Sequence, residues 1–198
     1  MYPARMNALR SKDGRVFRLA QDAEEHAMCA ALASERARTP RYGFRGVRLP
    51  DDAERPSYHA ALDDKGCLLA TLRAFTLARN AHENIRARLC AVPEGRIADV
   101  GVYYRHDETN ETPQWPLLAG LFASLHAGGV RFAYACGHGA VVRALTKIGF
   151  ERLSATPFRA PDWDYEWHPL LLDIDARAAD DDSAFWRRCR EVKESAAG

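Results

Sequence analysis

The sequence predicts a mixed α/β fold in which one sheet carries helices on both faces. A hairpin comes first: Ser57–Leu62 and Cys67–Leu77 are strand-like runs, and Asp63-Asp64-Lys65-Gly66 supplies the turn between them. Further along, the strand-like runs Arg96–Tyr104 and Val130–Cys136 enclose a helical segment, and a second helical segment follows. A hairpin followed by a β-α-β-α-β order is typical of such a sheet, because the helices must pack against its faces.

The elements of the first half follow from local signals. A short strand is expected at Arg15–Ala20, and a helix at Gln21–Arg38, where apolar residues recur near helical spacing. Asp22 with Glu25 three residues later resembles a capping box, which satisfies the first backbone N–H groups of a helix. A further short helix is expected at Asn80–Cys90, between the hairpin and the next strand.

The second half is punctuated by proline and glycine. A helix is expected to open at Pro113 or Pro116 and to run through Ala127, because proline suits the first turn and two glycines follow. The remaining elements are a helix at His138–Ile148, strands at Glu151–Thr156 and Tyr165–Ile174, and a terminal helix at Ala184–Ser195. We therefore expect an N-terminal extension over 1–20, one domain over 21–178, and an acidic segment with a short helix over 179–198.

The composition excludes several classes of protein. The 28 basic and 27 acidic residues nearly cancel, so charge alone would not drive binding to nucleic acid. No run of 18 apolar residues occurs, so no membrane span is expected. The five cysteines are scattered without a CxxC pair, which favours reduced thiols in the cytoplasm over disulfides or a zinc ribbon.

The order of elements resembles the GNAT superfamily of acyltransferases over roughly residues 20–175. Four segments carry the resemblance in the family's order: His59–Arg73 as a hairpin, Ile97–Tyr104 as the fourth strand, Trp115–Gly129 leading into Val130–Ala135, and Ala144–Phe150 as a helix that ends in Gly-Phe. The resemblance implies a mostly antiparallel sheet with one parallel pair in its middle. The strands Arg96–Tyr104 and Val130–Cys136 should form this pair and splay apart at their carboxyl ends, near Tyr103 and Cys136.

Such a splayed pair suits an acyl thioester. The phosphopantetheine arm of the donor is an amide chain, which can pair with an exposed strand edge. The resemblance implies that this role falls to the backbone of four consecutive residues: Val102, Tyr103, Tyr104 and Arg105. The donor is then carried by coenzyme A or by acyl carrier protein, and the acceptor is a small amine. The N-terminus of the following helix favours the donor's phosphates.

The sequence departs from the wider superfamily at two places. The Arg105–Pro113 segment lacks the glycines of the usual phosphate loop and carries three carboxylates. Leu145 stands where the superfamily often has a tyrosine that acts as the general acid. With both departures, the layout of the chain is similar to that of the autoinducer synthases and the N-acyl amino acid synthases. These enzymes usually take acyl groups from acyl carrier protein. Because Asp99-Val100-Gly101-Val102 replaces the Glu-x-Ser-Arg signature of the autoinducer synthases, homoserine lactone synthesis itself is not expected.

Asp99 is the first candidate for catalysis, as the base that accepts the ammonium proton of the amine. The alternative is a structural carboxylate bonded to Arg96 or Arg73. His106 and His138 follow the carboxyl ends of neighbouring strands and are further acid–base candidates, although surface loop histidines would look the same. Their spacing matches no ligand pattern, so no metal site is predicted.

Arginines and aromatic residues are the candidates for substrate binding. Arg45 and Arg73 could fix an acidic acceptor or the acidic helix of a carrier protein, or else belong to a solvated face. Trp163 and Trp167 alternate with acidic residues and predict either a wall of an acyl tunnel or a half-buried strand. The sequence therefore predicts an N-acyltransferase, and its alternative is a catalytically degenerate binding or regulatory protein of the same fold.

Overall fold

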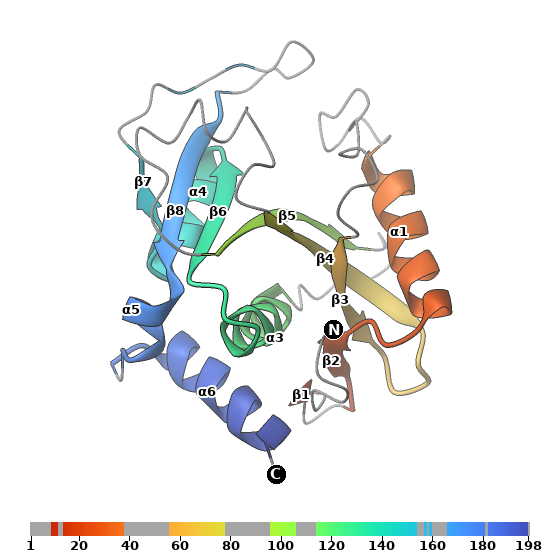
Figure 1. The fold of residues 1–198 in the computed structure, drawn as a ribbon. Coiled ribbons are helices and arrows are strands. Elements are labelled where there is room, and N and C mark those ends of the chain that lie inside the picture. Colours follow the sequence, from red (N-terminus) through yellow and green to blue (C-terminus); the bar gives the residue numbers. More distant parts are fainter. Residues whose placement is uncertain are drawn as a thin grey trace.

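The strands of the computed structural model form one mixed sheet (Figure 1). The structure describes residues 9–11, 14–37, 56–77, 96–105, 114–153, 157, 159, 166–180 and 182–197. The described strands are β1 (Leu9–Arg10), β2 (Val16–Leu19), β3 (Ser57–Leu62), β4 (Leu68–Leu77), β5 (Ile97–Arg105), β6 (Phe132–Gly137), β7 (Glu151–Arg152) and β8 (His168–Asp173). Their order across the sheet is β1-β2-β3-β4-β5-β6-β8-β7, and β5 with β6 is the one parallel pair among them.

Helices lie on both faces of this sheet, as predicted. The described helices are α1 (Ala23–Ala37), α3 (Gln114–Ala127), α4 (Gly139–Lys147), α5 (Ile174–Ala178) and α6 (Ala184–Ala197). Side chains of α1 pack on one face with those of β3, and side chains of α3, α4 and α6 share a core on the other face. The helix expected at Asn80–Cys90 lies outside the described residues.

The hairpin of β3 and β4 shows how closely local signals set the elements. The bounds of β3 are those predicted, and β4 begins one residue later than expected. In the turn, the Asp63 N–H donates to the Cys67 carbonyl at 2.9 Å, and Gly66 adopts a φ of +86°, which a glycine tolerates best. At α1, the Glu25 N–H donates to the Asp22 carboxylate at 2.9 Å, as the capping pattern predicts.

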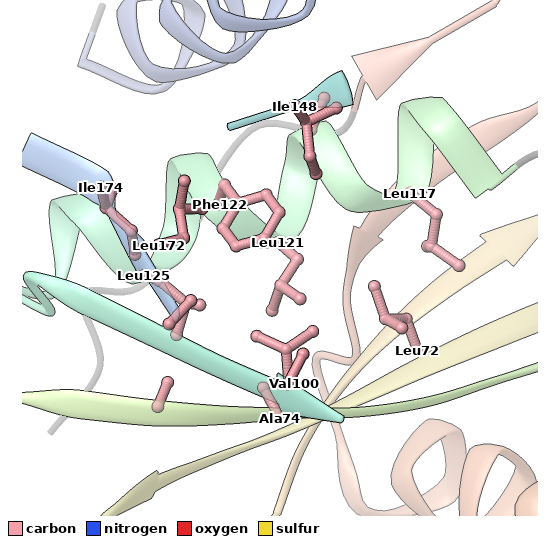
Figure 2. Packing of buried hydrophobic residues seen from close by; sticks show 14 of the residues in the cluster. Leu72, Ala74, Val100, Leu117, Leu121, Phe122, Leu125, Ile148, Leu172 and Ile174 are labelled. Atoms are coloured by element: carbon pink, nitrogen blue, oxygen red, sulfur yellow. The ribbon is translucent and has the colours of Figure 1, made fainter. Parts of the chain in front are cut away.

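The main core lies between the sheet and α3 (Figure 2). Leu72, Ala74 and Val100 point from β4 and β5 toward Leu117 and Leu121 of α3. Because side chains alternate along a strand, Thr71, Arg73 and Phe75 point to the opposite face, where α1 packs. The two faces of β4 therefore have different roles: one is apolar core, and the other carries a buried arginine.

The C-terminal segment packs onto this core through aromatic side chains. Trp186 of α6 is buried, and its indole N–H donates to the Ile148 carbonyl at 2.9 Å. The ring of Phe122 lies 5.8 Å from that of Trp186 and 6.0 Å from that of Phe150, which follows α4. Phe122 therefore links α3 to both the end of α4 and the terminal helix.

His59 is a buried histidine on the α3 side of β3. Its Nε2 lies 2.9 Å from the Ser124 hydroxyl, which itself donates to the Gly120 carbonyl at 2.9 Å. The hydroxyl therefore accepts a hydrogen bond from Nε2–H, so Nε2 carries a proton. Burial lowers the pKa of His59 from 6.5 to about 3.

This burial predicts an acid-sensitive fold. Between pH 6.5 and about pH 3, the unfolded chain binds a proton on His59 and the folded chain does not. The free energy of unfolding is therefore highest above pH 6.5 and falls as the pH is lowered toward 3. The contribution is about 1.4 kcal/mol per pH unit at most. Urea titrations between pH 4 and 7 should show a shallower slope for His59→Leu than for the native chain. Ser124→Ala keeps the histidine buried, so it should lower stability at every pH but keep the slope; equal slopes in His59→Leu and the native chain would contradict this account.

Candidate acyl-transfer site

The parallel strands β5 and β6 pair over only three residues each. Ile97, Ala98 and Asp99 pair with Phe132, Ala133 and Tyr134, yet β5 continues to Arg105 and β6 to Gly137. In Figure 1 the two strands start side by side and point apart. The predicted parallel pair and its splay are confirmed, and the separation begins directly after Asp99 and Tyr134. We call the two separated edges, residues 100–105 of β5 and 135–137 of β6, the strand opening.

A β-bulge in β5 accounts for this divergence. Leu72 pairs with Tyr103, but Ala74 pairs with Val100, so Gly101 and Val102 together face the single residue Arg73. An extra residue in one strand bends that strand and increases its twist. The bulge lies just beyond the last pair between β5 and β6, where the bend turns β5 away from β6.

Asp99 lies at the apex of the strand opening. It is half-buried, and its register neighbours are Phe75 on β4 and Tyr134 on β6. Of the two arginines named in the structural alternative, Arg96 donates to the Gly128 carbonyl at 2.5 Å, and the Arg73 guanidinium lies over the Phe75 ring. These contacts do not decide between the two roles of Asp99. The position fits the role predicted for a base, and the role itself stays a prediction.

Arg73 crosses from β4 toward β5 on the same face as Asp99. Only 7% of its surface is exposed, and its guanidinium carbon lies 4.8 Å from the centre of the Phe75 ring. A Cβ atom at Gly101 would lie 3.2 Å from its Nε, so the absence of a side chain there is what lets the guanidinium pass. The structure therefore places this predicted substrate-binding residue beside the bulge.

The β6 side of the strand opening carries a stripe of polar and aromatic groups. The Tyr134 hydroxyl lies 3.0 Å from the Cys136 sulfur. His138 precedes α4 in an extended conformation, and its ring lies 5.2 Å from that of Trp167, edge to face. The structure thus brings together two predicted residues, His138 and Trp167. Tyr134 was missed by the sequence, where it reads as one more apolar residue of a buried strand.

Several predicted residues cannot be placed. His106, Arg45 and Trp163 lie outside the described residues, as does most of the Arg105–Pro113 segment. For Val102, Tyr103, Tyr104 and Arg105 the structure describes the backbone, which belongs to β5. Leu145 is half-buried and packs against the main core.

The described residues lack two features that would have suggested other functions. They contain no group of three His, Cys, Asp or Glu side chains that could hold a metal ion. Among the helices that the structure describes, none has the length and hydropathy needed to cross a membrane.

Solved structures share the fold of this chain. FeeM, an N-acyl amino acid synthase from uncultured soil microbes, matches with a TM-score of 0.67 at 8% identity, over 83% of this chain and 93% of its own. The chain has the GNAT fold. MesI, a CoA-dependent acyl-homoserine lactone synthase, matches this GNAT-fold chain with a TM-score of 0.57 at 15% identity, over 90% of this chain and 95% of its own.

The likeness extends to other GNAT-fold acyltransferases. A spermidine N-acetyltransferase, SpeG, from Vibrio cholerae matches with a TM-score of 0.54 at 10% identity, over 84% of this chain and 97% of its own. No protein-family model matches the chain, and no curated protein does. The GNAT fold predicted from the sequence is confirmed, and its solved neighbours include the two kinds of synthase that the sequence resembles.

Proposed function

We propose that this GNAT-fold protein is an N-acyltransferase, similar to the autoinducer and N-acyl amino acid synthases, that moves an acyl group from a thioester to an amine. The observation that carries the proposal is the strand opening with Asp99 at its apex. The likeness to FeeM and MesI supports the same activity class.

The strand opening has the chemistry to hold the donor's arm. The facing edges of β5 and β6 do not pair with each other beyond Asp99, so their backbone N–H and C=O groups can bond to an amide chain laid between them. Residues 102–105 of β5 are the backbone segment that we assign to this role. The donor supplies an acyl carbon activated by its bond to sulfur.

The side chains around the opening supply proton transfer and shape. Asp99 accepts the ammonium proton of the acceptor, which leaves a neutral amine able to attack the acyl carbon. We assign His138 as a further acid–base group at this end of the sheet, where its ring packs against that of Trp167. Trp167 is 9% exposed and forms part of the wall along which we place the acyl chain.

A transfer assay tests this function. Purified protein is mixed with octanoyl-coenzyme A or octanoyl acyl carrier protein and a panel of small amines. We expect release of the free thiol together with an equal amount of octanoyl amide, measured by mass spectrometry. If neither donor gives an amide with any amine of the panel, the alternative of a degenerate binding protein of the same fold takes its place.

The donor itself is open to prediction. The Arg105–Pro113 segment has no glycine to form a phosphate nest, and Asp107, Glu108 and Glu111 repel phosphate. We therefore expect weak binding of coenzyme A and a preference for acyl carrier protein, although MesI is CoA-dependent. Calorimetry decides: a low-micromolar dissociation constant for coenzyme A, about 7–8 kcal/mol of binding free energy, would contradict this expectation.

The cysteines fit a reducing compartment. In the described part of the chain, Cys29, Cys67, Cys136 and Cys189 form no disulfide. Because thiols persist where glutathione keeps them reduced, we propose that the reaction takes place in the cytoplasm.

A further inference from the structure

Arg73 is a buried cation without a counter-ion in the described part of the chain. Only 7% of its surface is exposed, and no described group bonds to its Nε. None of the ion pairs found between described residues includes it. Burial of an unpaired charge is costly for a fold. A guanidinium kept in such a place is typical of a site that an anion completes.

The local structure holds this guanidinium in one orientation. The Phe75 ring, two residues along β4, lies under it. Its Nε and one terminal nitrogen lie over Gly101, since a Cβ there would come within 3.2 and 3.4 Å of them. The pair formed by Nε and one terminal nitrogen is the edge that binds a carboxylate through two parallel hydrogen bonds. The Nε, to which no described group bonds, belongs to that edge.

Arg73 and the site expected for the donor's phosphates lie on opposite faces of the sheet. Leu72 and Ala74 point to the core under α3, so Arg73 between them points to the α1 face. Burial raises the pKa of Tyr58, and the nearby Arg73 charge opposes this rise by lowering it. Tyr58 packs with residues of α1, so the Arg73 charge lies on the α1 face. The N-terminus of α3, where donor phosphates are expected, lies on the other face. An anion at Arg73 therefore belongs to the acceptor.

Asp99 lies at the right spacing on the same face. It pairs with Phe75, and paired residues point to the same side of a sheet. Gly101, under the guanidinium, is two residues further along β5, roughly 6.6 Å at the rise of an extended strand. One hydrogen bond at each end of an α-amino acid spans such a distance.

We propose that Arg73 binds the carboxylate of the acceptor, so that the acceptor is an α-amino acid or a similarly short amine that carries a carboxylate. This inference rests on the proposed N-acyltransferase activity. With its carboxylate on Arg73, the acceptor directs its amine toward Asp99. The nitrogen bonds to the acyl carbon, the carbon–sulfur bond breaks, and the thiol leaves with a proton. The product keeps a free carboxylate.

Matched pairs of acceptors test the inference. L-leucine is compared with 3-methylbutylamine, L-phenylalanine with 2-phenylethylamine, and L-tyrosine with tyramine, each with the octanoyl donor. At least one amino acid should exceed its decarboxylated partner in kcat/KM by about 10- to 100-fold, the usual loss for a charge-assisted hydrogen bond. Equal use of both members of every pair, or use of the decarboxylated amines alone, overturns the inference and leaves the N-acyltransferase proposal standing.

Variants at the site separate binding from folding. Arg73→Met should raise KM for the preferred amino acid by about 10- to 100-fold and leave the decarboxylated amine unaffected. If Arg73 had a purely structural role, Arg73→Met would instead lower the activity toward both the amino acid and the decarboxylated amine. Because Arg73→Met removes a buried charge that has no counter-ion among the described residues, the melting temperature of the ligand-free protein should stay the same or rise. Gly101→Ala, whose Cβ displaces the guanidinium, should raise the same KM.

Calorimetry with the unreactive components provides a readout besides activity. The preferred amino acid should bind the native chain and bind Arg73→Met at least ten-fold more weakly, with coenzyme A binding unchanged between the two. If Arg73→Met weakens coenzyme A instead of the amino acid, the site holds a donor phosphate and the inference is wrong. If the amino acid binds through Arg73 but no amide forms, the inference stands and the proposed transfer fails.

Discussion

Asp99→Asn should lower turnover on the order of 10²–10⁴-fold at pH 7, with little change in folding. The substitution keeps the shape of the side chain and removes its ability to accept the ammonium proton. The loss should shrink at high pH, where the amine is already neutral and needs no base. Turnover and circular dichroism of the variant and the native chain, between pH 6 and 10, give the comparison.

A matched carboxylate serves as the control for Asp99. Asp64→Asn makes the same chemical change on an exposed residue of the β3–β4 turn and should leave turnover unchanged. Near-normal activity of Asp99→Asn at pH 7 would show that another group is the base, and His138 and His106 would then be the candidates. Loss of folded structure in Asp99→Asn would mean that the carboxylate is a structural partner.

Phe122→Ala should cost about 3–5 kcal/mol of unfolding free energy. The side chain has no exposed surface, and its ring contacts Phe150, Phe185 and Trp186, so its removal leaves a cavity where three segments meet. Because Phe185 and Trp186 belong to α6, the terminal helix should also loosen. Urea unfolding measures the first effect, and hydrogen exchange of α6 the second.

An exposed apolar residue gives the comparison for Phe122. Met28→Ala on α1 removes a side chain that is 39% exposed and should change stability by no more than about 0.5 kcal/mol. A loss below about 1 kcal/mol for Phe122→Ala would show that α6 does not pack on α3 as described.

Elements with strong local signals could be predicted from the sequence. The bounds of β3 follow from its pattern and from the turn at Asp63–Gly66, and the start of α1 follows from the Asp22–Glu25 cap. The five-residue helix α5 was not predicted: the expected strand ends at Ile174, which is the first residue of α5, and no element was expected at 175–178. The two-residue strand β1 carries no pattern of its own.

The candidate site could be predicted only in part, because it depends on contacts between strands. Asp99 and the splay followed from the resemblance to a fold. The bulge at Gly101 depends on the register between β4 and β5, which no local pattern encodes. For the same reason, neither the passage of Arg73 over Gly101 nor the place of Tyr134 beside Asp99 could be found in the sequence.

The most direct test of this account is a crystal structure of the protein with an octanoyl-pantetheine analogue in which a methylene group replaces the sulfur. The account predicts that the amide arm lies between β5 and β6 and bonds to the backbone of residues 100–105, with the acyl carbon near Asp99. An arm bound elsewhere on the molecule, or strands that stay closed to a saturating analogue, would contradict it.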